Sequence, residues 1–152
     1  MPFTELPTWM LSQAHQRAHG ILSAKLGQVD ARGYDFRILD VLAESPTPLS
    51  QIAIGSRARL DRRDVAVTLT ALEERGFIAR HPDPDDARRN LVSLTSAGLD
   101  RRQLLAALAA DAQEELLSPL DAEAREAFLG ALRLVGGGSA FADGSAAPSA
   151  NA

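Results

Sequence analysis

Apolar residues recur at every third or fourth position over most of the chain, which is the spacing of helices that bury one face. The pattern predicts six helices, over residues 9–28, 34–44, 50–57, 61–76, 95–117 and 121–135. Residues 77–81 and 91–95 read instead as two short strands, and the charged, turn-rich segment 82–90 joins them. We therefore expect a mainly α protein with one small β-hairpin.

The helix that begins after Asp61 is the centre of this pattern. Asp61 is a good N-cap, because its carboxylate can accept hydrogen bonds from the free N–H groups of the first turn. Gly76 is typical of a residue that ends a helix. The apolar residues form one stripe (Val65, Leu69 and Leu72), and the opposite face carries Arg62, Arg63, Ala66, Val67 and Thr70.

Arginines at the start of such a helix can reach guanine edges or phosphates in the DNA major groove. An ordinary amphipathic helix with a solvated charged face would show the same pattern. The segment after the helix favours DNA, because two helices and then a hairpin with a basic tip make a winged helix-turn-helix.

Two motifs resemble the multiple-antibiotic-resistance-regulator (MarR) family. The first is D-x-R-x-x-x-x-x-L-T, which begins at Asp86 and ends at Thr95, after the family's D-P pair at Asp83 and Pro84. The second is L-E-E-R-G-F-I-A-R, over residues 72–80. The resemblance runs from about Tyr34 to Gly98 and continues more loosely to Val135.

The resemblance implies a homodimeric repressor that binds an inverted-repeat operator in double-stranded DNA and is released by a small aromatic or phenolic effector. The expected parts are an N-terminal dimerisation helix (1–33), the winged helix-turn-helix (34–98), C-terminal dimerisation helices (99–135) and a low-complexity tail (136–152) that we expect to be disordered. Two alternatives stay open, namely a winged helix that docks proteins without DNA, and a transcriptional activator.

The resemblance also implies which side chains contact DNA. We call the helix over residues 61–76 the reading helix. Around its start and on the wing we expect DNA contacts from Arg57, Arg59, Arg62, Arg63, Ala66, Val67, Thr70, Arg88 and Arg89, with Asp86 orienting Arg88. The chain departs from the family at Arg59, where a glycine is usual. It departs again at Arg63 and Ala66, where small hydroxyl residues are frequent. The base preference of relatives therefore does not transfer.

The charge of the chain fits a localised DNA contact. The net charge is −4, which argues against a general nucleic-acid binder. Residues 54–90 hold eight arginines and seven acidic residues, whereas the rest of the chain holds eight basic and thirteen acidic residues. An acidic body behind a basic edge would orient the protein on DNA.

An effector pocket is expected between the first helix and the DNA-binding lobe, lined by Trp9, His15, His19, Tyr34 and Arg37. Dimer packing is the alternative for Trp9 and Tyr34. His15 and His19 lie four residues apart, which suits a metal. However, the chain has no cysteine and only one other histidine, so we expect no metal and no cofactor.

The sequence holds no catalytic motif, so we expect no enzymatic activity. It has no apolar run long enough to cross a membrane and no export signal, so we expect a cytoplasmic protein without a membrane partner.

Overall fold

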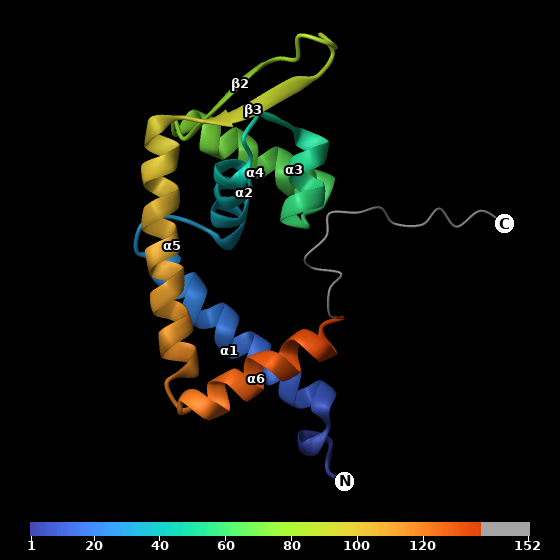
Figure 1. The fold of residues 1–152 in the computed structure, drawn as a ribbon, viewed down its shortest axis with the longest axis vertical. Helices are drawn as coiled ribbons and strands as arrows, with labels where there is room; N and C mark the ends of the chain where they lie inside the picture. Colours follow the sequence, from blue (N-terminus) through green and yellow to red (C-terminus); the bar gives the residue numbers. More distant parts are fainter. Residues whose placement is uncertain (138–152) are drawn as a thin grey trace, which may run out of the picture. The chain divides into compact units, whose positions relative to one another are not determined.

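Helices make up most of this computed structural model, which describes residues 1–137 (Figure 1). In chain order the elements are the 3-10 turn η1 (Phe3–Glu5), α1 (Pro7–Gly27), α2 (Gly33–Glu44), β1 (Leu49–Ser50), α3 (Gln51–Ala58), α4 (Arg62–Glu74), β2 (Ile78–Pro82), β3 (Asn90–Leu94), α5 (Ser96–Leu117) and α6 (Ala122–Val135). All six helices and both strands predicted from the sequence are present, with ends within a few residues of those expected.

The core lies between α2, α3, α4 and the sheet. The predicted stripe of α4 is confirmed, since Val65, Leu69 and Leu72 are at most 1% exposed. Ile38 and Leu39 of α2 are fully buried beside them. This core fixes α4 from behind and leaves its opposite face in solvent.

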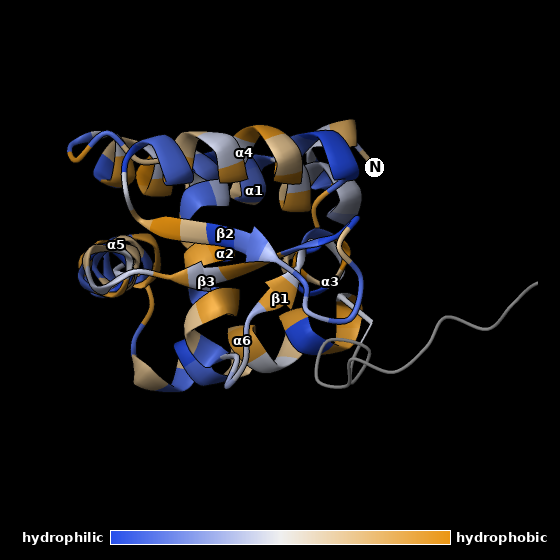
Figure 2. Cartoon of the chain, turned by 90° about the horizontal axis from the view of Figure 1, so that it is seen from above, coloured by the Kyte–Doolittle hydropathy of each residue, from blue (hydrophilic) through white to orange (hydrophobic). Residues whose placement is uncertain are grey.

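The sheet has three strands in the order β1-β3-β2, so the prediction of a two-stranded hairpin was incomplete (Figure 2). β1 pairs antiparallel with β3, with Leu49 opposite Val92. A strand of two residues is too short to show the alternation that identifies strands in a sequence. β2 and β3 form the wing, in which Ile78 lies opposite Leu94 and Pro82 opposite Asn90.

Side-chain caps begin four of the helices, among them the cap predicted at Asp61. The N–H groups of Ala53, Asp64, Gly98 and Ala124 donate to the side chains of Ser50, Asp61, Thr95 and Asp121, at 2.8–3.3 Å. Gly76 follows α4 with φ +75°, a left-handed conformation that costs glycine little. These local bonds set where α4 starts and where the wing leaves it.

α1 and α5 extend beyond the winged-helix core. Every residue from 1 to 17 is exposed, and within α1 only Leu26 is buried. α5 is attached to α2 by Arg102, whose Nε and Nη2 atoms donate to Asp40 Oδ1 at 2.9 and 2.6 Å. In α5, Leu105 and Ala112 are buried, whereas Leu99 and Leu104 are more than 40% exposed.

The chain divides into two compact units, the first from Met1 to Leu116 and the second from Leu117 onward. The second unit contains α6, in which no residue is buried. The predicted disordered tail falls, apart from Gly136 and Gly137, outside the described residues. Within residues 1–137 no helix combines the length and the apolar character needed to cross a membrane.

Candidate nucleic-acid interface

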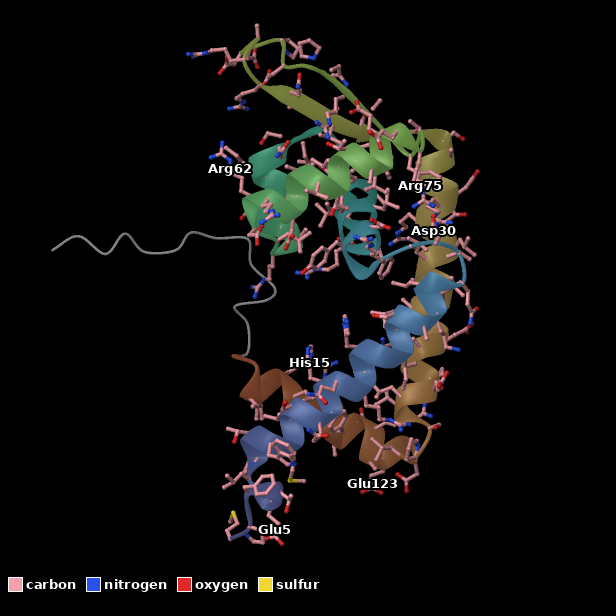
Figure 3. All side chains as sticks on the ribbon, turned by 180° about the vertical axis from the view of Figure 1, so that it is seen from behind. Glu5, His15, Asp30, Arg62, Arg75 and Glu123 are labelled. Atoms are coloured by element: carbon pink, nitrogen blue, oxygen red, sulfur yellow. The ribbon has the colours of Figure 1, made fainter. Side chains whose placement is uncertain are left out.

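The exposed face of α4 presents the residue types expected at a DNA-reading surface. Arg62 and Arg63 occupy its first turn and are exposed, and Figure 3 shows Arg62 directed away from the protein at this end of the helix. Val67 is 60% exposed one turn further along, although it is apolar. This face therefore combines positive charge with an apolar position suited to a thymine methyl group.

An open groove of about 730 Å³ separates the start of α4 from the wing. The start of α3, the start of α4 and both wing strands contribute to its wall, with Ser50, Gln51, Ile52, Arg62, Arg80, Arg88, Arg89 and Asn90 among the lining residues. Four of these are arginines, which come from α4, from β2 and from the loop between the wing strands. The fold thus brings Arg62 of the reading helix together with Arg88 and Arg89 of the wing, which are far apart in the sequence.

The wing tip is closed by two aspartates. Asp83 is 8% exposed, accepts from the N–H of Asp85 at 2.9 Å and pairs with Arg89 Nη2 at 3.1 Å. Asp86 accepts from both the backbone N–H and the Nε of Arg88, at 3.1 and 3.3 Å, as an orienting partner would.

The two wing arginines therefore differ. The side chain of Arg88 is 92% exposed beside Asp86. That of Arg89 is 58% exposed and is tied to a buried carboxylate, although it also lines the groove. Of the two wing arginines, Arg88 is therefore the one whose side chain is freer to extend into solvent and contact a ligand.

Sequence reasoning missed Arg80. Its Nη2 donates to Thr70 Oγ1 at 3.3 Å, and its Nε lies 3.4 Å from Glu73 Oε2, so Arg80 ties the wing to the exposed side of α4. Thr70 Oγ1 also donates to the Ala66 carbonyl at 3.0 Å, which occupies the hydroxyl proton of a predicted DNA contact. The alternation of side chains along a strand could have identified Arg80. It lies two residues from buried Ile78 and therefore on the same face of the strand.

Arg59 occupies the turn between α3 and α4 with φ +52° and ψ +50°. This left-handed conformation explains why a glycine is usual there, because it costs other residues roughly 1–2 kcal/mol. The Arg59 carbonyl accepts from Arg37 Nη2 at 3.0 Å, and the same nitrogen donates to the Ala58 carbonyl. Arg37, predicted for an effector pocket, here closes the C-terminal end of α3.

The other predicted effector residues are spread along α1 and the start of α2. Trp9 is 40% exposed and packs edge-on against Phe3, with ring centroids 5.0 Å apart. Tyr34 is 41% exposed, and the guanidinium of Arg37 lies 6.0 Å from its ring centroid. None of the five predicted residues lines the groove beside α4 or the smaller cavity beside β3.

His15 and His19 lie on one face of α1, as their spacing predicts. Their rings are nearly parallel, with centroids 6.2 Å apart, and His19 Nε2 is 3.4 Å from Ser23 Oγ. Among residues 1–137 no group of three or more histidine, aspartate or glutamate side chains is arranged to hold a metal ion.

The helix pair α3 and α4, with the basic face of α4 exposed, and the adjacent wing of β2 and β3 define a winged helix-turn-helix protein. The sequence profile of the MarR family matches residues 31–89, the segment that runs from the start of α2 to the wing tip. The chain is also 31% identical over 101 residues to the transcriptional regulator HosA of Escherichia coli, which covers 64% of this chain and 72% of HosA. The chain belongs to the MarR family of DNA-binding transcriptional regulators.

Solved structures agree with this assignment. The transcriptional regulator PcaV of Streptomyces coelicolor, in complex with its natural ligand, superposes with a TM-score of 0.76 at 26% identity and covers 90% of this chain and 95% of its own. A probable transcriptional regulator from Pseudomonas aeruginosa gives 0.77 at 30% identity, covering 86% and 97%. Each of these relatives is described as a transcriptional regulator.

Proposed function

We propose that the chain is a homodimeric repressor that binds an inverted-repeat operator and is released by a small aromatic acid. The observation that carries the DNA part is the groove in which arginines from α4 and the wing converge. In this arrangement Arg62, Arg63 and Val67 enter the major groove, the sugar–phosphate backbone lies between α4 and the wing, and Arg88 reaches the adjacent minor groove. Arg57 and Arg59 contribute positive charge at the edge.

The test is selection of duplexes from a random pool by the purified protein, followed by sequencing. We expect an inverted repeat whose half-sites are about 10 base pairs apart, one turn of the double helix. Binding to it should weaken steeply with salt, because each phosphate contact releases counterions. Recovery of no enriched sequence, with no retention on heparin, would favour a protein-docking module. A promoter reporter then separates repression from activation.

The dimer part of the proposal rests on apolar surface that residues 1–137 of a single chain leave exposed. In α1 the exposed apolar residues include Trp9, Met10 and Leu11, and in α6 they include Phe128, Leu129 and Leu132. Extensive exposed apolar surface on helices that lie outside a core is typical of an interface. A twofold dimer would also match the symmetry of an inverted repeat.

Sedimentation at micromolar protein concentration should therefore give a particle of about twice the 16.2 kDa chain mass. Replacing Leu129 and Leu132 together by aspartate should shift the particle toward the monomer, because two charges would have to be buried. As a control, Arg133→Asp also introduces an aspartate into α6, but at a residue that is not apolar. A wild-type monomer at these concentrations would contradict both the dimer and the inverted-repeat operator.

The effector part is supported by PcaV, whose structure holds its natural ligand, and by the aromatic and imidazole groups of Trp9, His15, His19 and Tyr34. A ligand that releases DNA must bind better to the form that cannot bind DNA. Titration with phenolic acids should change the fluorescence of Trp9, the only tryptophan, and weaken operator binding in parallel. If no compound changes either signal, the protein represses constitutively or uses another class of ligand.

A further inference from the structure

Hydrogen bonds connect the C-terminal end of the reading helix α4 to the turn that follows α1. Arg75 directly follows α4, and its Nη1 donates to the Asp30 carbonyl at 2.9 Å. Arg101 of α5 approaches the same turn, where its Nη2 donates to the carbonyls of Val29 and of Asp30, the latter at 3.1 Å. Figure 3 shows Arg75 and Asp30 together at the end of α4 opposite Arg62.

The ring of Phe77 lies close to both arginines. The guanidinium carbons of Arg75 and Arg101 are 5.2 and 5.3 Å from its centroid, within the range of a cation–π interaction. Phe77 is the residue that leads from Gly76 into the wing. Burial, followed by repulsion from Arg75, lowers the pKa of Arg101, while Asp35 and Asp30 act in the opposite direction.

The contact is made to backbone, so the carboxylate of Asp30 is secondary. The Asp30 side chain is 98% exposed, and its Oδ2 is 3.6 Å from Arg75 Nη2, a pairing worth little in water. By contrast, the carbonyls of Val29 and Asp30 lie just beyond the last turn of α1, where carbonyl groups have no partner within the helix. Asp30 adopts φ +52°, which turns the chain from α1 toward α2.

The other contacts of α1 with the core also lie toward its C-terminal end, where Leu22 packs against buried residues. Leu26 is buried, Lys25 pairs with Glu115 at 3.2 Å, and residues 1–17 are exposed. α1 has 21 residues and is thus a lever about 30 Å long, held at one end. A tilt of roughly 10° at the held end would move the far end by about 5 Å, which exceeds the rise of about 3.4 Å per base pair.

We propose that Arg75 and Arg101 form a carbonyl clamp on Val29 and Asp30 that sets the angle between the reading helix and α1, and so sets the half-site spacing the dimer accepts. This inference rests on the proposed function, because it takes α1 as a dimerisation helix. Arg75 and Arg101 are positioning residues. Neither needs to touch DNA, since Arg75 lies one helix length, about 20 Å, from Arg62.

The experiment uses the full chain and the operator recovered by selection, together with duplexes in which one central base pair is inserted or removed. Wild-type protein should bind the selected spacing best. Arg75→Met should weaken binding to that spacing roughly two- to thirtyfold, the range in which residues remote from a site change coupling. It should lose much less on the altered spacings, so the preference between spacings becomes flatter.

Two further measurements separate this role from others. The salt slope should be unchanged in Arg75→Met, because no phosphate contact is lost. Asp30→Asn should keep wild-type affinity and spacing preference, since it removes the charge, keeps the carbonyl, and places a residue that tolerates a left-handed conformation. Sedimentation and thermal unfolding establish that each variant is folded and dimeric.

Should Arg75→Met fail to fold, Phe77→Leu decides, because it keeps an apolar side chain and removes the ring that both guanidiniums approach. The inference is overturned if a folded, dimeric variant keeps its spacing preference, if it loses affinity equally on every spacing, or if Asp30→Asn loses as much as Arg75→Met. Absence of any preferred sequence for wild-type protein would instead count against the proposed function.

Discussion

Replacing Arg63 by alanine should reduce operator affinity by about 1–3 kcal/mol and relax specificity at one base pair in each half-site. Arg63 lies in the first exposed turn of α4, where a side chain can reach base edges, and Asp61 caps the helix directly before it. A base contact is lost only on the correct sequence, so affinity for scrambled DNA should change little. The measurement is binding to operator and scrambled duplexes across a salt series.

Arg88→Ala is the matched comparison, since it removes the same charge from the wing. The Arg88 side chain is 92% exposed and its guanidinium is oriented by Asp86, so it can reach phosphate or the minor groove. Contacts of that kind position the protein without reading sequence. We expect weaker binding to operator and scrambled DNA alike, and a salt slope reduced by about one per subunit. Full affinity and discrimination in Arg63→Ala would mean that another face of α4 enters the groove.

Gly98→Ala should destabilise the fold by about 1–3 kcal/mol or more, the cost of adding a methyl group to a packed core. A Cβ atom at Gly98 would lie 1.9 Å from the Phe77 carbonyl oxygen and 2.9 Å from its carbon. These are backbone atoms, and the Phe77 carbonyl also accepts from the N–H of Thr95 at 3.2 Å, so the wing cannot move away at low cost. Urea unfolding at fixed protein concentration measures the change.

Gly20→Ala is the control, because nothing lies within 4 Å of a Cβ built at Gly20 in the middle of α1. Alanine is favoured over glycine in a helix by about 1 kcal/mol, so this variant should be as stable as wild type or more so. Equal stability of the Gly98→Ala variant would show that α5 can shift against the wing. The carbonyl clamp would then also be expected to tolerate movement.

Local chemistry made the order and the limits of the elements predictable. Val65, Leu69 and Leu72 repeat at helical spacing, and this repeat alone identifies the buried face of α4, since neighbours three or four apart share a side of a helix. Asp61 and Gly76 mark the two ends of that helix through bonds and conformations that involve only adjacent residues. The basic face of α4 and the exposed arginine of the wing were predictable in the same way.

Contacts between distant residues required the tertiary structure. β1 is recognised only through its pairing with β3, and Arg80 is seen to join the wing to α4 only once both are in place. Arg37 lies beside the ring of Tyr34, as a pocket residue could, yet its guanidinium donates to carbonyl groups at the end of α3. The clamp joins two arginines to one turn. Arg75 contacts a residue 45 positions earlier in the chain, and Arg101 contacts a residue 72 positions earlier. Periodicity and capping are encoded over a few residues, whereas the partners of a long arginine depend on the path of the whole chain.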